Sequence, residues 1–402
     1  MMFRLTGSLA GMLLLAASQA ADRAPASVRD LPYGEVLYHY YQDDYFDSIV
    51  HLLKARRQGT LDYHAGEAEL LLGGLDLSYG LRDEAGRIFT TLLDAHPRAD
   101  VRNRAWFHLA RLSWQSGDSG SALAALQAIG DDVPASLAGE VAHLQSLVLL
   151  ARGENAATVE LLGNIRPDRG WSPYLDYNLG VARIRSGALA DGSSTLAQVG
   201  ELDGYNETRR TLRDKANLAL GYSYLQHDEP DRARQYLERV RLEGPLSNRA
   251  LLGTGWADIE AGAYARALVP WLELGSRDTT DPAVQEVLLA IPHAMTRMQL
   301  HGRAIEHYEQ AIDSYYAEQA QLDESIAAIL DGKLLAALQT ASDSNDIGWL
   351  QDIETTTATP ALRYQVELMA RHDFQEAVKN YHDLRRLDDN LADWAGSIGA
   401  FS

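Results

Sequence analysis

The residues of this 402-residue chain that could do chemistry do not combine into a catalytic pattern. Glu140 and His143 have the spacing of a metal-binding carboxylate and imidazole on one helix, but such sites need a second pair on a facing helix. Gly332 and Lys333 lack the upstream glycine and the following hydroxyl of a phosphate-binding loop. No two of the 12 histidines flank a glutamate at the metalloprotease spacing. We therefore predict a protein without catalytic activity, metal or cofactor.

The composition limits the class of partner. The chain has 36 basic and 56 acidic side chains, so its formal net charge is −20. Nucleic acids and anionic lipids are bound by clustered Lys and Arg, and we therefore expect neither as the main partner. Apolar residues make up 46% of the chain and cysteine is absent, so packing must stabilise the fold without disulfides.

The first twenty residues have the organisation of a secretory signal. Arg4 supplies a positive charge, 9–17 is a short apolar run, and Ser18-Gln19-Ala20 ends with small residues where signal peptidase cleaves. The alternative, a membrane anchor, needs about 20 apolar residues. We expect a signal peptide over 1–20, a linker over 21–31, and a soluble mature protein in the periplasm of a Gram-negative bacterium.

One pattern of small and large residues recurs along the chain. Around Ala85, a glycine lies twelve and again five residues before it, and Phe89 lies four residues after it. Ala122 has Gly117 and Leu126 at the same offsets. The small residues that anchor the copies are Ser48, Ala85, Ala122, Thr158, Gly192, Ala233, Ala267 and Ala304, at spacings of 37, 37, 36, 34, 41, 34 and 37, with a further copy at Ala377.

This pattern predicts pairs of antiparallel helices. Apolar residues recur at intervals of three and four on each side of a glycine that permits the chain to reverse. Small residues at the anchor and twelve before it allow the two helices to cross closely. The large residue four after the anchor is expected to fill the gap toward the next pair. Because one pair cannot bury its own apolar face, we predict an all-α right-handed solenoid of about nine helix pairs.

At these positions the sequence resembles the tetratricopeptide repeat family. The resemblance covers 32–316 as a solenoid and 360–402 as a final helix pair and cap. It departs from the family at Thr158, which replaces the small anchor, and near 200–210, where the longest spacing indicates an insertion. Between the solenoid and the final helix pair, residues 317–359 break the register of the repeat. We expect a long helix there to about Gln339 and then a polar joint.

The resemblance implies that the first helix of each pair lines a concave groove. Aromatic and Arg side chains suit such a groove because they provide much contact area and pair with carboxylates. The alternative is that the aromatic residues pack between neighbouring pairs. The residues expected to face the groove are Phe107, Arg111, Trp114, Tyr174, Tyr177, Arg185, Tyr222, Trp256, His293 and Arg297.

The resemblance also implies a function in binding. We expect a scaffold or adaptor that captures a partner protein or peptide, as part of an envelope assembly or export system. The alternative is a cell-wall glycan enzyme, because some periplasmic lytic transglycosylases carry a large helical-repeat region and a catalytic glutamate followed by serine. Glu324 and Ser325 form that dipeptide here, although about forty surrounding residues are too few for a separate lysozyme-like domain.

Overall fold

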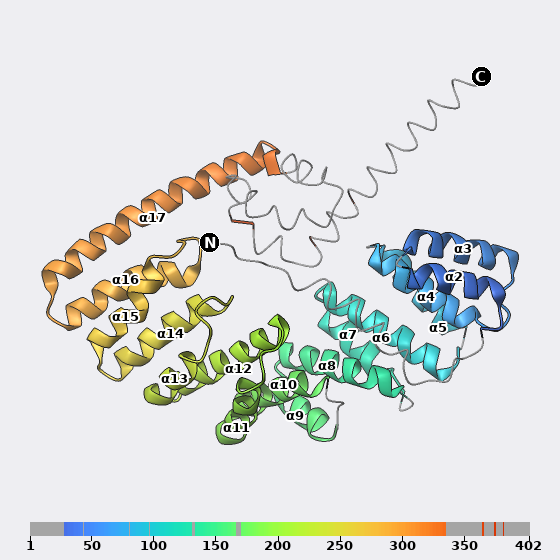
Figure 1. Ribbon diagram of the computed structural model, residues 1–402, viewed down its shortest axis with the longest axis horizontal. Helices are drawn as coiled ribbons and strands as arrows, with labels where there is room; N and C mark the ends of the chain where they lie inside the picture. Colours follow the sequence, from blue (N-terminus) through green and yellow to red (C-terminus); the bar gives the residue numbers. More distant parts are fainter. Residues whose placement is uncertain are drawn as a thin grey trace. The chain divides into compact units, whose positions relative to one another are not determined.

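The computed structural model describes residues 28–42, 44–79, 81–95, 97–130, 133–165 and 170–334, together with 364–365, 374 and 381. Within these residues the chain forms sixteen helices and no strand (Figure 1). The predicted all-α class is therefore confirmed. The predicted signal peptide, polar joint and C-terminal helix pair lie outside the described residues.

The helices follow one another with short connections. Those of the first half are α2 (Leu31–Tyr41), α3 (Tyr45–Gln58), α4 (Ala65–Ser78), α5 (Arg82–Asp94), α6 (Ala99–Gln115), α7 (Ser119–Gln127) and α8 (Ala135–Ala151). Those of the second half are α9 (Asn155–Gly163), α10 (Ser172–Arg185), α11 (Leu189–Gly200), α12 (Glu207–Leu225), α13 (Pro230–Leu237), α14 (Ser247–Glu260), α15 (Tyr264–Gly275), α16 (Pro282–Arg297) and α17 (His301–Leu330).

The described helices belong to two compact units. The N-terminal unit holds α2 to α8 and the C-terminal unit holds α9 to α17, with the division after Glu154. Within each unit the most extensive contacts join the two helices of a pair, such as α4 with α5 and α14 with α15. Several first helices also contact the first helix of the next pair, as α4 contacts α6 and α12 contacts α14. This arrangement is the predicted helical-repeat solenoid.

The small anchor residues lie where the two helices of a pair cross. All of them in the described chain are buried: Ser48, Ala85, Ala122, Thr158, Gly192, Ala233, Ala267 and Ala304. At Gly192 the helices approach so closely that an added Cβ would lie 2.7 Å from the carbonyl oxygen of Gly180. A side chain larger than these anchors would therefore separate the pair.

The large residue four positions after the anchor packs inside its own pair. The Trp271 side chain is fully buried and occupies the place that a Cβ on Gly255 would need, at 2.0 Å from the indole Nε1. The same relation joins Leu237 to Gly221 and Phe89 to Gly73. Our expectation that this residue fills the gap toward the next pair is thus corrected, because the glycine twelve before the anchor receives it. Phe89 contacts its own pair and the next one, because its ring also stacks on His108 of the next pair, with ring centroids 5.0 Å apart.

The turn between the helices of a pair has one backbone conformation. The predicted turn glycines Gly117, Gly153, Gly187 and Gly262 have φ of 81°, 77°, 89° and 71°. In two pairs without this glycine, Asp228 and Gln299 occupy the position with φ of 57° and 60°. The left-handed turn is therefore kept even where the sequence provides a residue that rarely adopts it.

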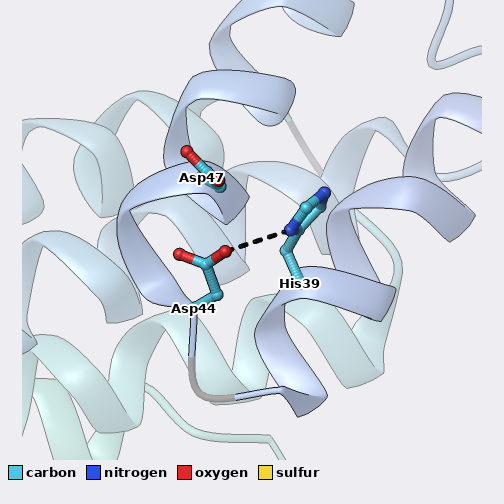
Figure 2. Close-up of side chains that lie close together, drawn as sticks. All are labelled: His39, Asp44 and Asp47. Atoms are coloured by element: carbon cyan, nitrogen blue, oxygen red, sulfur yellow. Dashed lines mark hydrogen bonds and ion pairs between the residues drawn. The ribbon is translucent and has the colours of Figure 1, made fainter.

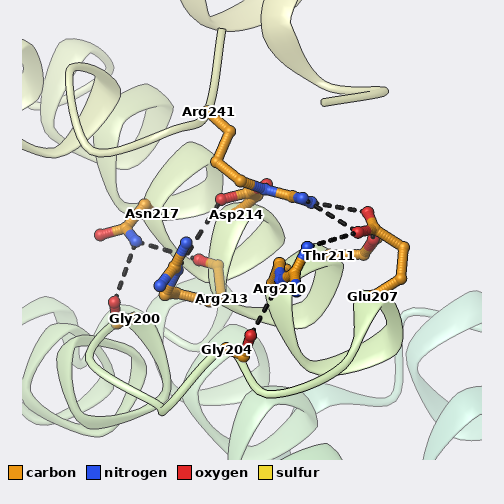
Figure 3. Close-up of polar contacts among 9 residues, drawn as sticks. All are labelled: Gly200, Gly204, Glu207, Arg210, Thr211, Arg213, Asp214, Asn217 and Arg241. Atoms are coloured by element: carbon orange, nitrogen blue, oxygen red, sulfur yellow. Dashed lines mark hydrogen bonds and ion pairs between the residues drawn. The ribbon is translucent and has the colours of Figure 1, made fainter. Parts of the chain in front are cut away.

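The predicted insertion near 200–210 is the loop between α11 and α12, and polar side chains hold it in place (Figure 3). Asn217 donates to the Gly200 carbonyl at 3.1 Å, and Arg210 Nε donates to the Gly204 carbonyl at 2.8 Å.

The carboxylate of Asp214, a fully buried residue of α12, accepts a hydrogen bond from Arg241 Nε at 2.6 Å. Arg241 also donates through both terminal nitrogens to Glu207, at 3.1 and 2.9 Å. This pairing ties the start of α12 to the chain that follows α13, so the longer repeat keeps its place in the stack.

The last described helix, α17, crosses the boundary that we placed between 316 and 317. It continues to Leu330, and Gly332 with φ of 76° then forms a turn, whereas the expected end at Gln339 lies outside the described residues. Among the described residues, no helix combines the length and the apolar character needed to cross a membrane.

A matched pair of glycine substitutions tests the close crossing. Gly192→Ala should destabilise the protein by about 1–3 kcal/mol, because the methyl group would overlap the α10 backbone. Gly86→Ala, in α5, should instead stabilise it by about 0.5–1 kcal/mol, because nothing lies within 4 Å and alanine favours the helix. Thermal unfolding followed by circular dichroism measures both. Equal shifts in the two variants would contradict the crossing model.

The partly buried His108 provides a test by pH. Its Nδ1 is covered and has no hydrogen-bond partner among the described residues. Burial, with the nearby charges of Arg111 and Arg104, lowers its pKa to about 3. The folded state therefore stays neutral while the unfolded state takes up a proton near pH 6.5, so stability falls as the pH decreases through 6.5 toward 3.

The protonation difference at His108 alone should lower the free energy of unfolding by roughly 2 kcal/mol between about pH 6.5 and pH 5. His108→Phe keeps a ring against Phe89 and should lose less stability over that range than the wild type. The exposed His301→Phe serves as control and should retain the wild-type pH dependence. If His108→Phe also retains the wild-type pH dependence of stability, His108 is not the group that titrates.

Candidate functional site

The first helices α10, α12, α14 and α16 contact one another in order and form a continuous layer in the C-terminal unit. We call this the first-helix layer. Seven of the ten predicted groove residues lie on it: Tyr174, Tyr177, Arg185, Tyr222, Trp256, His293 and Arg297. These four helices therefore carry the candidate site.

The middle of the layer is an ordered contact between α12 and α14. The Tyr222 hydroxyl donates to the Arg249 carbonyl oxygen at 2.8 Å, and the Arg249 guanidinium lies 5.9 Å from the centre of the Tyr222 ring. Gly253 allows this approach, because an added Cβ would lie 3.2 Å from Tyr222 Cζ. Burial raises the pKa of the Tyr222 phenol, which remains the hydrogen-bond donor.

A second contact joins α14 to α16. Trp256 Nε1 donates to the carboxylate of Glu286 at 2.8 Å, and the indole packs edge-on against buried Trp271, with centroids 5.1 Å apart. Trp256 is partly buried while Glu286 is exposed. The tryptophan thus contributes to the core and also fixes a carboxylate at the surface.

On α10, two tyrosines lie beside exposed positive charge. Tyr174 and Tyr177 are partly buried and pack against the core shared with α12. Burial raises the pKa of Tyr177, whereas the charges of Arg185 and Arg249 lower it, so both guanidinium groups lie near this phenol. Arg185 and Arg249 are exposed, and no salt bridge engages either of them within the described residues.

The α16 end of the layer is an exposed stripe. Glu286, Leu289, His293 and Arg297 follow at intervals of three and four, and all are exposed. Arg297 donates to the Tyr264 hydroxyl at 2.9 Å, which orients its guanidinium toward the start of α15. His293 and Arg297 were predicted to lie here, whereas Glu286 and Leu289 were missed although they share the helical spacing.

The other three predicted residues lie on α6 of the N-terminal unit. Phe107 is buried in the core, with 5% of its surface exposed, and Trp114 packs against the same core. Arg111 lies near His108 and Glu140, since its charge lowers the pKa of both groups. Burial is nevertheless the largest effect at Glu140 and raises the pKa of its carboxyl. These three residues form a set of their own, and Phe107 contributes to packing.

The layer combines aromatic surface, a fixed carboxylate and three exposed guanidinium groups, a composition suited to binding extended peptide. Arg249, which was not predicted from the sequence, has its guanidinium 5.9 Å from the centre of the Tyr222 ring, and its charge also acts on Tyr177. Glu324, the residue of the enzymatic alternative, is exposed on α17. A glycosidic general acid needs an enclosed site with a second carboxylate, and the exposed position of Glu324 does not provide one.

Comparison with known proteins supports the repeat assignment. The model of the tetratricopeptide repeat family matches residues 218–280, which span α13, α14 and α15 and part of α12. A search of curated proteins finds no match.

Solved structures with a similar fold include MamA from MSR-1, with 18% identity, coverage of 45% of this chain and 99% of that chain, and a TM-score of 0.35. A tetratricopeptide repeat protein of Parabacteroides merdae is 14% identical over 66% of this chain and 99% of its own, with a TM-score of 0.42. The C-terminal part of a repeat protein of Cytophaga hutchinsonii is 16% identical, with coverage of 64% of this chain and 99% of that chain and a TM-score of 0.47.

All three TM-scores are below 0.5, so the assignment depends on the sequence match and on the repeat geometry. Buried small anchors and left-handed turns recur on both sides of residues 218–280, and the glycine that receives a large side chain recurs on the N-terminal side, at Gly73 and Gly180. The chain therefore contains tetratricopeptide repeat sequence over residues 218–280, within a longer array of similar helix pairs.

Proposed function

We propose that this protein is a non-enzymatic periplasmic scaffold that captures a partner protein or an extended peptide on its first-helix layer. Repeat solenoids of this class act in protein–protein interaction through extended surfaces. The observation that carries the proposal is the pair of exposed guanidinium groups, Arg185 and Arg249, beside the partly buried rings of Tyr177 and Tyr222.

The chemistry of the layer indicates what the partner presents. In a chain of net charge −20, two exposed arginines that form no salt bridge within the described residues are local positive points that can bind carboxylates or backbone carbonyls. The aromatic rings beside them offer apolar area that is already ordered by packing, so little rotamer entropy is lost on binding. We infer a peptide segment that carries an acidic group next to an apolar side chain.

The layer can be tested by reversing its charge. Arg185→Glu with Arg249→Glu should weaken partner capture at least tenfold, equivalent to about 1.4 kcal/mol. Co-purification from envelope extracts identifies the partner, and titration of that partner then measures the affinity. Helicity and the unfolding midpoint should be unchanged, because both residues are exposed.

The matched control places the same charge change on second helices. Arg232→Glu with Arg303→Glu changes two exposed residues of α13 and α17. Capture should persist in this control. An equal loss in both double variants would mean that net charge, and not the layer, determines binding.

The periplasmic location is proposed from the signal-like segment over 1–20. A phosphatase reporter that folds only outside the cytoplasm, fused after Arg23, should be active when the fusion is expressed in a Gram-negative host. Replacing the apolar run over 9–17 with polar residues should abolish that activity. A reporter that is inactive in the unaltered fusion would refute export.

A further inference from the structure

A cluster of metal-ligating side chains lies at the turn between α2 and α3 of the N-terminal unit (Figure 2). His39 is in the last turn of α2, Asp44 immediately precedes α3, and Asp47 is in the first turn of α3. One ligand atom from each residue can be chosen so that all lie within 4.8 Å of one another. One donor from α2, one from the turn and one from α3 therefore lie close enough to share an ion.

Asp44 is held in this position by the backbone and faces the imidazole. Its amide donates to the His39 carbonyl at 3.0 Å, which closes the turn. An aspartate at the N-cap usually accepts hydrogen bonds from the amides of the first turn, but the Asp44 side chain makes no such bond. Its carboxylate instead lies 3.3 Å from His39 Nδ1.

A second imidazole lies beside the cluster. His51 of α3 stacks on His39 with ring centroids 4.7 Å apart, and its Nδ1 lies 3.4 Å from the Glu35 carboxylate. Glu35 precedes His39 by four residues and Asp47 precedes His51 by four, so each helix presents a carboxylate and an imidazole on one face. The cluster itself therefore combines one imidazole with two carboxylates, with a second imidazole packed against the first, which distinguishes it from an ordinary group of surface acids.

We propose that His39, Asp44 and Asp47 bind a divalent first-row transition ion of the zinc class. Imidazole nitrogen with carboxylate oxygen suits Zn²⁺, Ni²⁺ or Cu²⁺, whereas Mg²⁺ and Ca²⁺ prefer oxygen donors alone. Three protein ligands leave at least one coordination position for water. His51 and Glu35 lie beside the three ligands and help to position them.

Such an ion would link the end of α2 to the start of α3, the first helix pair that the structure describes. An ion that binds the folded state and not the unfolded chain raises the unfolding midpoint. The site was not evident in the sequence, because its ligands lie on two helices and match no motif within one helix.

Isothermal titration of the tag-free full-length protein with ZnCl₂ tests the proposal. The wild type should bind one ion saturably, and MgCl₂ and CaCl₂ should give no comparable binding. His39→Gln and Asp47→Asn should each weaken zinc binding by at least about tenfold. The matched control is His301→Gln, an exposed histidine of the C-terminal unit, which should bind as the wild type does.

Thermal unfolding provides the second readout. Zinc should raise the unfolding midpoint of the wild type and of His301→Gln, and should not raise that of His39→Gln. Circular dichroism without zinc verifies that the variants are folded. The proposal is overturned if zinc does not bind, if calcium binds equally well, or if His39→Gln and Asp47→Asn retain the wild-type affinity.

Discussion

The close crossing of two helices at a buried small residue is the constraint on which the rest of the structure depends. At Gly192 the neighbouring helix backbone leaves no space for a Cβ, and at Gly255 the Trp271 ring occupies that space. Because the helices cross so closely, the large residue four after the anchor is enclosed within its own pair. Each pair thereby becomes a flat unit whose remaining apolar surface must be covered by the next pair.

The stacking of these units determines what the surface presents. First helices contact first helices, so side chains that leave the core on α10, α12, α14 and α16 meet in one layer. Tyr222 and Trp256 are held there by hydrogen bonds to the next first helix, through the Arg249 carbonyl and the Glu286 carboxylate. The layer is therefore ordered before any partner binds, which favours binding with little entropic cost.

Much of the fold was predictable because it follows from local spacing. The anchors, the turn glycines and the helix pairing were all deduced from offsets within single repeats. Asp228 and Gln299 were not recognised as turn residues, since a non-glycine at positive φ has no sequence signal of its own. The extent of α17 was also missed, because the repeat register is lost within the helix while its helical backbone continues.

The candidate site was only partly predictable, for a different physical reason. A period of three to four identifies one face of a helix but does not distinguish a ring in the core, such as Phe107, from a ring at its edge, such as Trp256. Arg249 and Glu286 became evident only from contacts between helices of different pairs. The metal-ligating cluster depends likewise on the pairing of α2 with α3.

Site-specific photo-crosslinking in the envelope of cells that produce the partner tests most directly whether the first-helix layer is the binding surface. The photoreactive residue would replace Leu289 on the layer or Val269 on the second helix α15, positions that are 49% and 70% exposed. The account predicts that the partner is crosslinked from position 289 and not from 269. Crosslinking from 269 alone would contradict it, because the binding surface would then lie on the second helices.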